Sequence, residues 1–320
     1  MVRGGAQNPR SPWLTWIVVC HQSARDLGVL LPSLQSELAA LAARGCDSEL
    51  IVVDNASTDG SAQVVTELAP GATLLRLDEN IGYGAAINRA AGLAKGRWLA
   101  FGNADLCVPQ GGLHELPRTL AAAADDVALI GPALFGSDGQ PSLSAGRFPS
   151  LLSLLRGLRR PAHRRKYLRR REHRAGGVHW LTGACLFARA DVFEAIKGFD
   201  EGFFLYYEDV DLAARLRSGG HRVVFEPSVK LIHVRPHHGR APQPQIEALV
   251  RQSRLLYFRK HRPAFEAALL SALMRMEPLV RSRSRSRPAL LPTASEPAES
   301  APRGGVKPVS APVHVGREAG

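Results

Sequence analysis

Three carboxylates lie within four positions of one another in the segment FFLYYEDVDLAARL, residues 203–216. They are Glu208, Asp209 and Asp211, and they follow a run of aromatic residues. If a helix begins just before them, Asp209 faces apolar side chains, whereas Asp211 aligns with Arg215 as an exposed ion pair would. Glu208 suits the positive N-terminal end of such a helix. A carboxylate on the inner side of a helix start can have its pKa tuned for proton abstraction, so Asp209 is a candidate base.

The segments around these acids alternate between short apolar strands and helices, which predicts an α/β fold with a mostly parallel sheet and helices on both faces. In such sheets ligands bind beyond the carboxyl ends of the strands. The expected strands are residues 14–20, 49–53, 72–77, 97–101, 127–135, 222–225 and 229–233. The expected helices are residues 24–43, 59–68 (capped by Ser57 or Thr58), 82–94, 109–124, 189–197 and 207–218.

Polar side chains lie in the loops that follow four of these strands. Asp105, in the triplet Asn103-Ala104-Asp105, offers a hard oxygen ligand for Mg²⁺ or Mn²⁺, although such a triplet also suits a simple turn. His233 closes a later strand and is either a structural histidine or a nitrogen ligand beside such a metal. The other strand-end residues are His21, Asp54, Asn55 and Asn80.

The segment NIGYGAAINRA, residues 80–90, carries glycines spaced like part of a dinucleotide-binding fingerprint. It follows the third expected strand rather than the first, and the required acid about 20 residues further on is missing. A Rossmann dehydrogenase is therefore disfavoured. The glycines instead suit a close approach of helix and sheet beside a ligand.

The charge of the chain is concentrated in two segments. The 320 residues carry a formal net charge of +12. Residues 156–174 contain ten basic residues (Arg or Lys) and one acidic residue. Residues 281–320 contain seven basic and three acidic residues. The remainder has 24 basic and 25 acidic residues and is close to neutral. A nucleic-acid-binding body is thus disfavoured, and an anionic surface contacted through the basic segments fits better.

The four cysteines, Cys20, Cys46, Cys107 and Cys185, occur singly and without metal-site spacing. This pattern is typical of reduced thiols in a cytoplasmic protein. No stretch reaches the roughly 18–20 apolar residues of a membrane span. We therefore expect a cytoplasmic protein, with peripheral attachment to the inner face of the cell membrane as a hypothesis.

Taken together, the motifs resemble the inverting family 2 glycosyltransferases of the GT-A fold, in particular their rhamnosyltransferase-like group. The resemblance covers about residues 13–238. The matching segments, in the family's order, are IVVDNASTDGS, ENIGYGAAINRA, FGNADL, GACLFARADVFEAIKGFDEGFFLYYEDVDLAARL and EPSVKLIHV.

The resemblance implies a role for each matching residue. Asp209 would be the general base with Glu208 in support, and Asp105 and His233 would hold Mg²⁺ or Mn²⁺ on the donor diphosphate. The residues implied to contact the nucleotide sugar are Cys20, His21, Asp54, Asn80, Asn88, Asn103, Gly183 and Ala184. The sequence departs from the family where His21-Gln22-Ser23 follows the first strand and where Asn103 replaces an aspartate.

The resemblance also implies a function and an organisation. The enzyme would move a sugar, first of all rhamnose from dTDP-rhamnose, to a lipid-linked or cell-wall glycan during polysaccharide biosynthesis. Independently of the resemblance, the apolar residues interleaved in the basic segment 156–174 favour an interfacial helix at an anionic membrane surface over a solvated loop. Two alternatives stay open: a catalytically silent nucleotide-sugar binder, and an RNA-binding protein that uses the arginine-rich segments. The expected parts are a lead (1–11), a nucleotide-sugar half (12–135), a basic insert (136–176), a catalytic half (177–280) and a disordered tail (281–320).

Overall fold

The computed structural model describes residues 12–157, 175–234 and 244–285. The chain divides into two compact units, Met1–Met274 and Arg275–Gly320. The fold below is that of the first unit. Of the second unit, only the C-terminal end of one helix is described.

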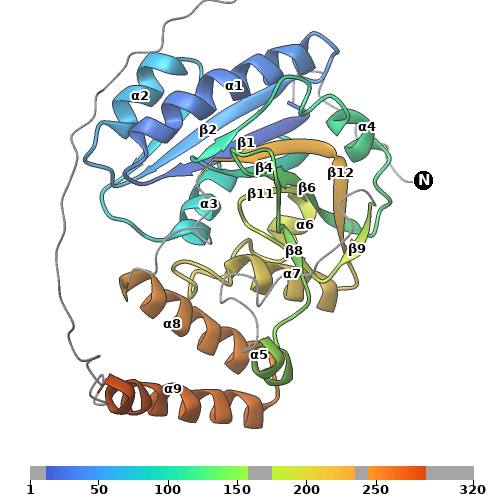
Figure 1. Ribbon diagram of the computed structural model, residues 1–320. Coiled ribbons are helices and arrows are strands. Elements are labelled where there is room, and N and C mark those ends of the chain that lie inside the picture. Colours follow the sequence, from blue (N-terminus) through green and yellow to red (C-terminus); the bar gives the residue numbers. More distant parts are fainter. Residues whose placement is uncertain (1–11, 158–174, 235–243, 286–320) are drawn as a thin grey trace, which may run out of the picture. The chain divides into compact units, whose positions relative to one another are not determined.

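Four parallel strands form one half of the main sheet (Figure 1), in the order β3-β2-β1-β4. Their apolar, β-branched sequences leave β1 and the centre of β2 buried on both faces, as expected for parallel strands covered by helices. The strands are β1 (Leu14–Cys20), β2 (Ser48–Asn55), β3 (Thr73–Leu77) and β4 (Trp98–Asn103).

The other half of the sheet is mixed. Strand β11 (Cys185–Arg189) lies antiparallel between β4 and β6 (Val127–Phe135), and β12 (Arg222–His233) runs parallel to β6. The short strands β5 (Leu106–Cys107), β7 (Pro141–Ser142) and β9 (Gly176–Val178) pair antiparallel with these. A separate ladder joins β8 (Ala145–Gly146) to β10 (Trp180–Leu181). The predicted α/β fold is confirmed.

Alternate residues of the central strands contribute to two apolar cores, one on each face of the sheet. Ile17 and Phe101 belong to one core, and Trp16 and Val18 to the other. The first core packs under α3 (Tyr83–Ala91), α6 (Ala190–Ala195), α7 (Glu208–Ser218) and α8 (Pro244–His261). The second packs under α1 (Ala24–Ala42), α2 (Ser61–Leu68) and α4 (Leu116–Ala121).

Several element boundaries differ from those predicted. The helix expected at 109–124 is reduced to α4, because residues 110–115 form turns and the helix ends at Ala121. The two strands expected at 222–225 and 229–233 are one strand, β12, with a register shift between Glu226 and Lys230. The cap expected from Ser57 or Thr58 is wrong, since α2 begins after Gly60 and the Asp59 carboxylate accepts the Ser61 amide.

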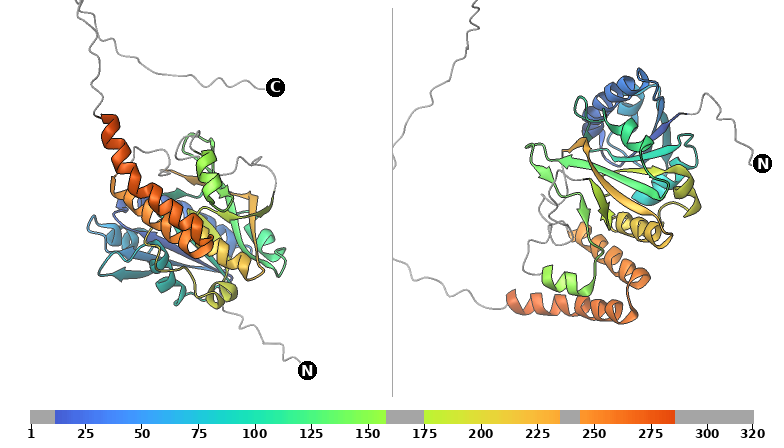
Figure 2. Two further views of the ribbon diagram at one scale, coloured as in Figure 1. Left: turned by 90° about the horizontal axis from the view of Figure 1, so that it is seen from below. Right: turned by 90° about the vertical axis from the view of Figure 1, so that its right-hand side faces the viewer.

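Helix α5 (Leu151–Gly157) and the part of α9 (Ala264–Arg285) that belongs to the first unit lie beyond α8, on the side away from β1 and β2 (Figures 1 and 2). Within the first unit, a hydrogen bond from the Leu151 amide to the Glu266 carboxylate at 2.9 Å joins α5 to α9. Most of the basic segment 156–174 falls outside the described residues. Among the helices that are described, none combines the length and the apolarity that crossing a bilayer requires.

Candidate active site

The carboxyl ends of β1, β2 and β4 bring predicted site residues into neighbouring positions. Cys20 pairs in register with Asp54, and Val19 pairs with Asn103. The His21 imidazole Nδ1 lies 2.8 Å from the Asn55 carbonyl oxygen. The edge predicted to bind a ligand is therefore a row of neighbouring residues along three strands, among them the polar side chains of Asp54 and Asn103.

Asp54 is a buried carboxylate within this row, only 2% exposed. Its Oδ1 accepts the Ser57 amide at 3.0 Å, and its Oδ2 lies 4.0 Å from Arg76 Nε. Burial, followed by the charge of Asp54, raises the pKa of the neighbouring Cys20 thiol to about 12. Cys20 is thus a neutral group at physiological pH and lines the row as a small apolar side chain.

Asn55 and Asn80 fix the loop that leads from β3 into α3. Asn55 Nδ2 donates to Asn80 Oδ1 at 2.9 Å, and Asn55 Oδ1 accepts the Ile81 amide at 3.0 Å. Gly82 follows with φ +88°, and a Cβ there would lie 2.5 Å from the Phe204 carbonyl oxygen. Glycine is therefore required at position 82 by both backbone conformation and space. Sequence reasoning placed Asn55 at a strand end but missed this positioning contact.

Tyr83 is a central residue that sequence reasoning missed. Its hydroxyl donates to the Gly183 carbonyl at 2.8 Å. Burial, and then the charges of nearby groups that include Glu208 and Asp209, raise the pKa of Tyr83 well above its ordinary value. The phenol therefore stays protonated and remains a hydrogen-bond donor. The signal in the sequence was an aromatic residue between two glycines, which by itself suggests no such role.

Asp209 lies at the start of α7 and points inward, as predicted from its helical face. It is 5% exposed; its Oδ2 accepts the Gly183 amide at 3.0 Å and its Oδ1 accepts the Val210 amide at 2.8 Å. The two residues before the helix, Tyr206 and Tyr207, have φ values of +65° and +66°. Consecutive non-glycine residues in this region are strained, and such strain is concentrated at functional sites.

Gly183 contacts both Asp209 and Tyr83 through its backbone. Its amide donates to Asp209 and its carbonyl accepts from Tyr83, while a Cβ on it would lie 3.6 Å from Glu208 Oε1. The next residue, Ala184, accepts the Asn103 amide at 3.0 Å through its carbonyl. The structure thus brings Asn103, Gly183 and Asp209 together from distant parts of the chain.

Asp105 and His233 form the candidate metal-binding pair. Strand β5 pairs with β12, and Asp105 Oδ1 lies 3.1 Å from His233 Nε2 with both side chains largely buried. Within the described ranges no group of three or more His, Cys, Asp or Glu side chains could hold a metal. One carboxylate and one imidazole fit a Mg²⁺ or Mn²⁺ ion whose remaining ligands come from substrate phosphates and water.

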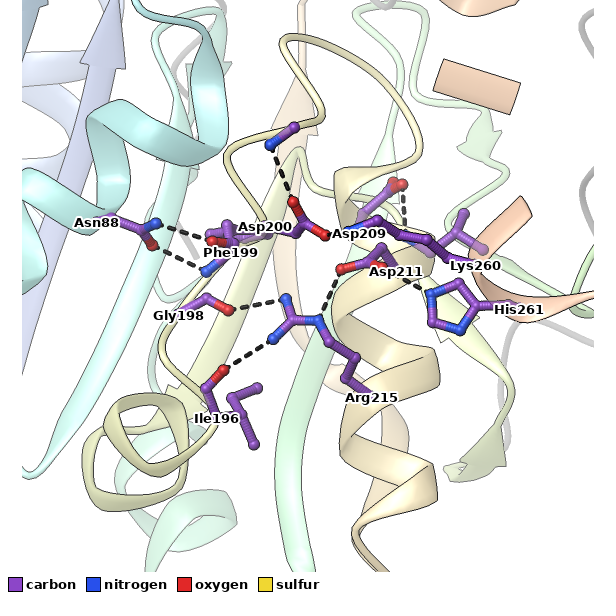
Figure 3. Close-up of polar contacts among 12 residues, drawn as sticks. Asn88, Ile196, Gly198, Phe199, Asp200, Asp209, Asp211, Arg215, Lys260 and His261 are labelled. Carbon is purple, nitrogen blue, oxygen red and sulfur yellow. Dashed lines mark hydrogen bonds and ion pairs between the residues drawn. The ribbon is translucent and has the colours of Figure 1, made fainter. Parts of the chain in front are cut away.

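Asp211 is held in a buried ionic cluster that anchors α7 (Figure 3). It is completely buried and accepts from Arg215 Nε and from His261 Nε2, each at 2.7 Å. The Arg215 guanidinium also donates to the carbonyls of Ile196 and Gly198 at 3.0 and 2.8 Å. The predicted Asp211–Arg215 pair is confirmed, but the expectation that it is exposed is wrong, because α8 covers it with His261.

Asn88 contacts the loop that precedes α7. Its amide nitrogen donates to the Phe199 carbonyl at 2.9 Å and to Glu201 at 3.2 Å, and its oxygen accepts the Phe199 amide at 2.8 Å. In the same loop, Asp200 pairs with Lys260 of α8 (Figure 3). Asn88 therefore ties α3 to the loop that precedes α7, and a contact with the nucleotide sugar stays a prediction.

Comparisons with known proteins identify the family to which the chain belongs. The model of glycosyl transferase family 2 matches residues 15–197. An N-acetylglucosaminyl-diphospho-decaprenol L-rhamnosyltransferase of Mycobacterium tuberculosis is 32% identical over 289 residues, which cover 79% of this chain and 92% of that protein. The succinoglycan biosynthesis protein ExoO of Rhizobium meliloti is 30% identical over 228 residues, covering 70% of this chain and 61% of that one.

Solved structures share the fold at lower identity. A structure of GalNAc-T7 with UDP, GalNAc and Mn²⁺ superposes with a TM-score of 0.52 and 16% identity, over 76% of this chain and 48% of that one. Staphylococcus aureus TarS gives a TM-score of 0.50 and 17% identity, over 86% of this chain and 44% of that one. This chain therefore spans about half the length of those two structures.

The fold is that of the GT-A glycosyltransferases. The family match, which covers more than half of the chain, makes the assignment specific: the protein belongs to glycosyl transferase family 2. The choice of a transferase over an RNA-binding protein is thereby confirmed.

Proposed function

We propose that this enzyme is an inverting rhamnosyltransferase that uses dTDP-rhamnose and a lipid-linked or cell-wall glycan acceptor, with Asp209 as general base. The observation that carries the proposal is the position of Asp209, whose carboxylate is buried, oriented by the Gly183 amide and set beside the hydroxyl-bearing Tyr83. A carboxylate fixed in this way is preorganised to accept a proton from a substrate hydroxyl. The relative named as a rhamnosyltransferase supports the choice of sugar and of a lipid-linked acceptor.

The proposed reaction is a single displacement. Asp209 accepts the proton of the acceptor hydroxyl as its oxygen forms a bond to the anomeric carbon, while the bond from that carbon to the diphosphate breaks. Because attack comes from the face opposite the leaving group, the configuration at the anomeric carbon inverts. Each Asp209 oxygen accepts one backbone amide and keeps a further lone pair for the acceptor. Glu208, 6% exposed at the same helix start, supports this carboxylate.

Asp105 and His233 are proposed to hold the divalent cation, Mg²⁺ or Mn²⁺. When bound, such a cation neutralises the charge that develops on the departing diphosphate. Asp105 Oδ1 and His233 Nε2 lie 3.1 Å apart, so the two side chains could share one ion if they moved slightly away from each other. Because the pair offers only two ligands, phosphate oxygens of the donor and water would complete the coordination shell.

The row along β1, β2 and β4 is proposed to hold the nucleotide. Asp54 would contact the base or ribose, with Cys20 and His21 lining the same surface. Asn103 and the Gly183–Ala184 backbone would lie beside the diphosphate and the donor sugar. Asn80 would act through the loop that it stabilises by accepting the Asn55 and Gly82 amides.

The donor assignment is tested by thermal unfolding of the full chain with dTDP-rhamnose, UDP-glucose and GDP-mannose, each with and without Mn²⁺. Binding to the native state raises apparent stability by RT ln(1 + [L]/Kd), so a donor at about 100 times its Kd adds about 2.7 kcal/mol. We expect a Mn²⁺-dependent increase with dTDP-rhamnose. An increase with UDP-glucose alone would refute the donor, and no increase with any of the three would contradict the nucleotide-sugar site.

The metal assignment is tested in the same assay with Asp105→Asn. This variant should bind dTDP-rhamnose with little dependence on Mn²⁺, because an amide is a weaker ligand than a carboxylate for a hard cation. Asp138→Asn, a change in an exposed acid outside the site, is the matched control and should retain the wild-type Mn²⁺ dependence. Wild-type Mn²⁺ dependence in Asp105→Asn would contradict the assignment.

A further inference from the structure

The first part of α9 exposes a wholly apolar face. Within Ala264–Met274, every exposed residue is Ala, Leu or Phe. Phe265, Leu269 and Leu273 are 68%, 47% and 43% exposed and recur at intervals of four residues, so that they form one stripe. The residues of this apolar face are Ala264, Phe265, Ala268, Leu269, Ala272 and Leu273.

The charged residue of the same helix segment lies on the inner side. Glu266 is 8% exposed, forms an ion pair with Arg262 at 2.6 Å and accepts the Leu151 amide of α5. A surface helix of a water-soluble domain normally shows the reverse, with charged residues outward. The distribution in α9 is therefore that of a helix whose outer side meets an apolar phase.

The neighbouring helix α5 adds apolar surface. Leu152 and Leu155 are 55% and 49% exposed, and α5 lies beside α9 in both views of Figure 2. Its last turn carries Arg156, which is exposed. Five large apolar side chains thus project from two adjacent helices, more than the scattered exposed residues that ordinary surfaces carry.

The charge of the chain indicates what covers this face. In the sequence, α5 leads into residues 156–174, with ten basic residues and one acidic residue. The apolar stripe of α9 is followed by the exposed Arg275 and then by the run RSRSRSR at 281–287. Apolar helices that continue in the sequence into arginine-rich segments match the composition of segments that bind the boundary between acyl chains and anionic headgroups.

We propose that the apolar face is a membrane-docking surface that lies in the interface of a bilayer containing anionic phospholipid. A second copy of the chain fits less well, because it would cover the apolar side chains but would offer no acidic partner for the basic segments that follow α5 and α9 in the sequence. Nucleic acid would bind the arginines through its phosphates but would make no favourable contact with the apolar stripe. The proposal concerns a surface away from the transfer site and needs no donor sugar, although it would place a lipid-linked acceptor near the enzyme.

The test is flotation of the full chain with vesicles of phosphatidylglycerol and phosphatidylcholine in equal amounts. The variant Phe265→Gln, Leu269→Gln and Leu273→Gln keeps good helix formers and should lower the partition coefficient at least about 50-fold, because three half-exposed apolar side chains no longer enter the interface. A matched control changes Val29, Leu68 and Leu93 to Gln, positions 47%, 38% and 49% exposed elsewhere on the surface. The control variant should bind like wild type.

Wild-type binding by the α9 variant would overturn the proposal, and so would equal losses in both variants. A wild-type dimer in lipid-free light scattering that the α9 variant abolishes, without vesicle binding, would assign the face to a second copy. Strong binding to RNA with no flotation would likewise overturn it. Transfer to a detergent-dispersed acceptor should be unchanged in the α9 variant. If the wild-type protein itself showed no sugar transfer, the proposed function would be refuted, whereas the flotation result would still decide the membrane proposal.

Discussion

Asp211→Asn should cost far more stability than the loss of an exposed ion pair on a helix would. Its carboxylate is completely buried and accepts from Arg215 Nε and His261 Nε2, each at 2.7 Å. The amide that replaces it keeps the shape but has one acceptor oxygen, so one of the two donors would face an NH₂ group. Hydrogen bonds to charged groups contribute about 1.5–3 kcal/mol each, and a broken buried ion pair costs about 3–5 kcal/mol. We therefore expect a loss of about 3–4 kcal/mol in the free energy of unfolding.

The loss is measured by urea unfolding followed by circular dichroism at pH 7.5. Asp126→Asn is the matched control, because Asp126 also accepts from two nitrogens of an arginine, Arg222, at 2.5 and 2.7 Å, but both side chains are about half exposed. Solvent screens such a pair, so the control should leave the unfolding midpoint close to wild type. Equal shifts in the two variants, or a loss below about 1 kcal/mol for Asp211→Asn, would refute the reasoning from burial.

Three further predictions concern the site. Gly82→Ala should destabilise the protein by at least about 2 kcal/mol in urea unfolding, because its Cβ would meet the Phe204 carbonyl. Gly45→Ala, with φ +78° but open space, should cost less, and equal losses would contradict the steric argument. Tyr83→Phe should lower stability by about 1 kcal/mol and reduce turnover in steady-state kinetics, since the Gly183 carbonyl loses its donor; no change in either would count against its positioning role. Because the pKa of Cys20 is raised to about 12, iodoacetamide at pH 8 should alkylate the partly exposed Cys46 and leave Cys20 unmodified in the folded protein, and rapid labelling of Cys20 would show that its thiol is accessible and ionised.

Local sequence patterns predicted much of the sheet. The strands 14–20 and 127–135 have the predicted bounds, because each is a continuous apolar run buried on both faces. The inward position of Asp209 agrees with the prediction from the helical period, although the same period placed the buried Asp211 outward. Such features depend on neighbours a few residues apart, which a single sequence displays directly.

The missed features depend on residues that are distant in the sequence. His261 reaches Asp211 across 50 positions, and Tyr83 reaches Gly183 across 100. The sequence therefore predicts an exposed ion pair between Asp211 and Arg215, since nothing in that helix reveals that α8 covers Asp211. The apolar face of α9 was missed for another reason: its Ala and Leu residues suit a buried helix equally well, and only the fold shows which side meets solvent.

The central claim is that Asp209 is the base that takes the acceptor proton. It is tested most directly by the turnover of Asp209→Asn with dTDP-rhamnose and a glycan acceptor, alongside the Kd of the donor. Loss of a positioned general base lowers turnover by about 10²–10⁴-fold, whereas donor affinity should stay within about threefold because the amide can still accept from the Gly183 N–H. Turnover near that of wild type would contradict the assignment of Asp209.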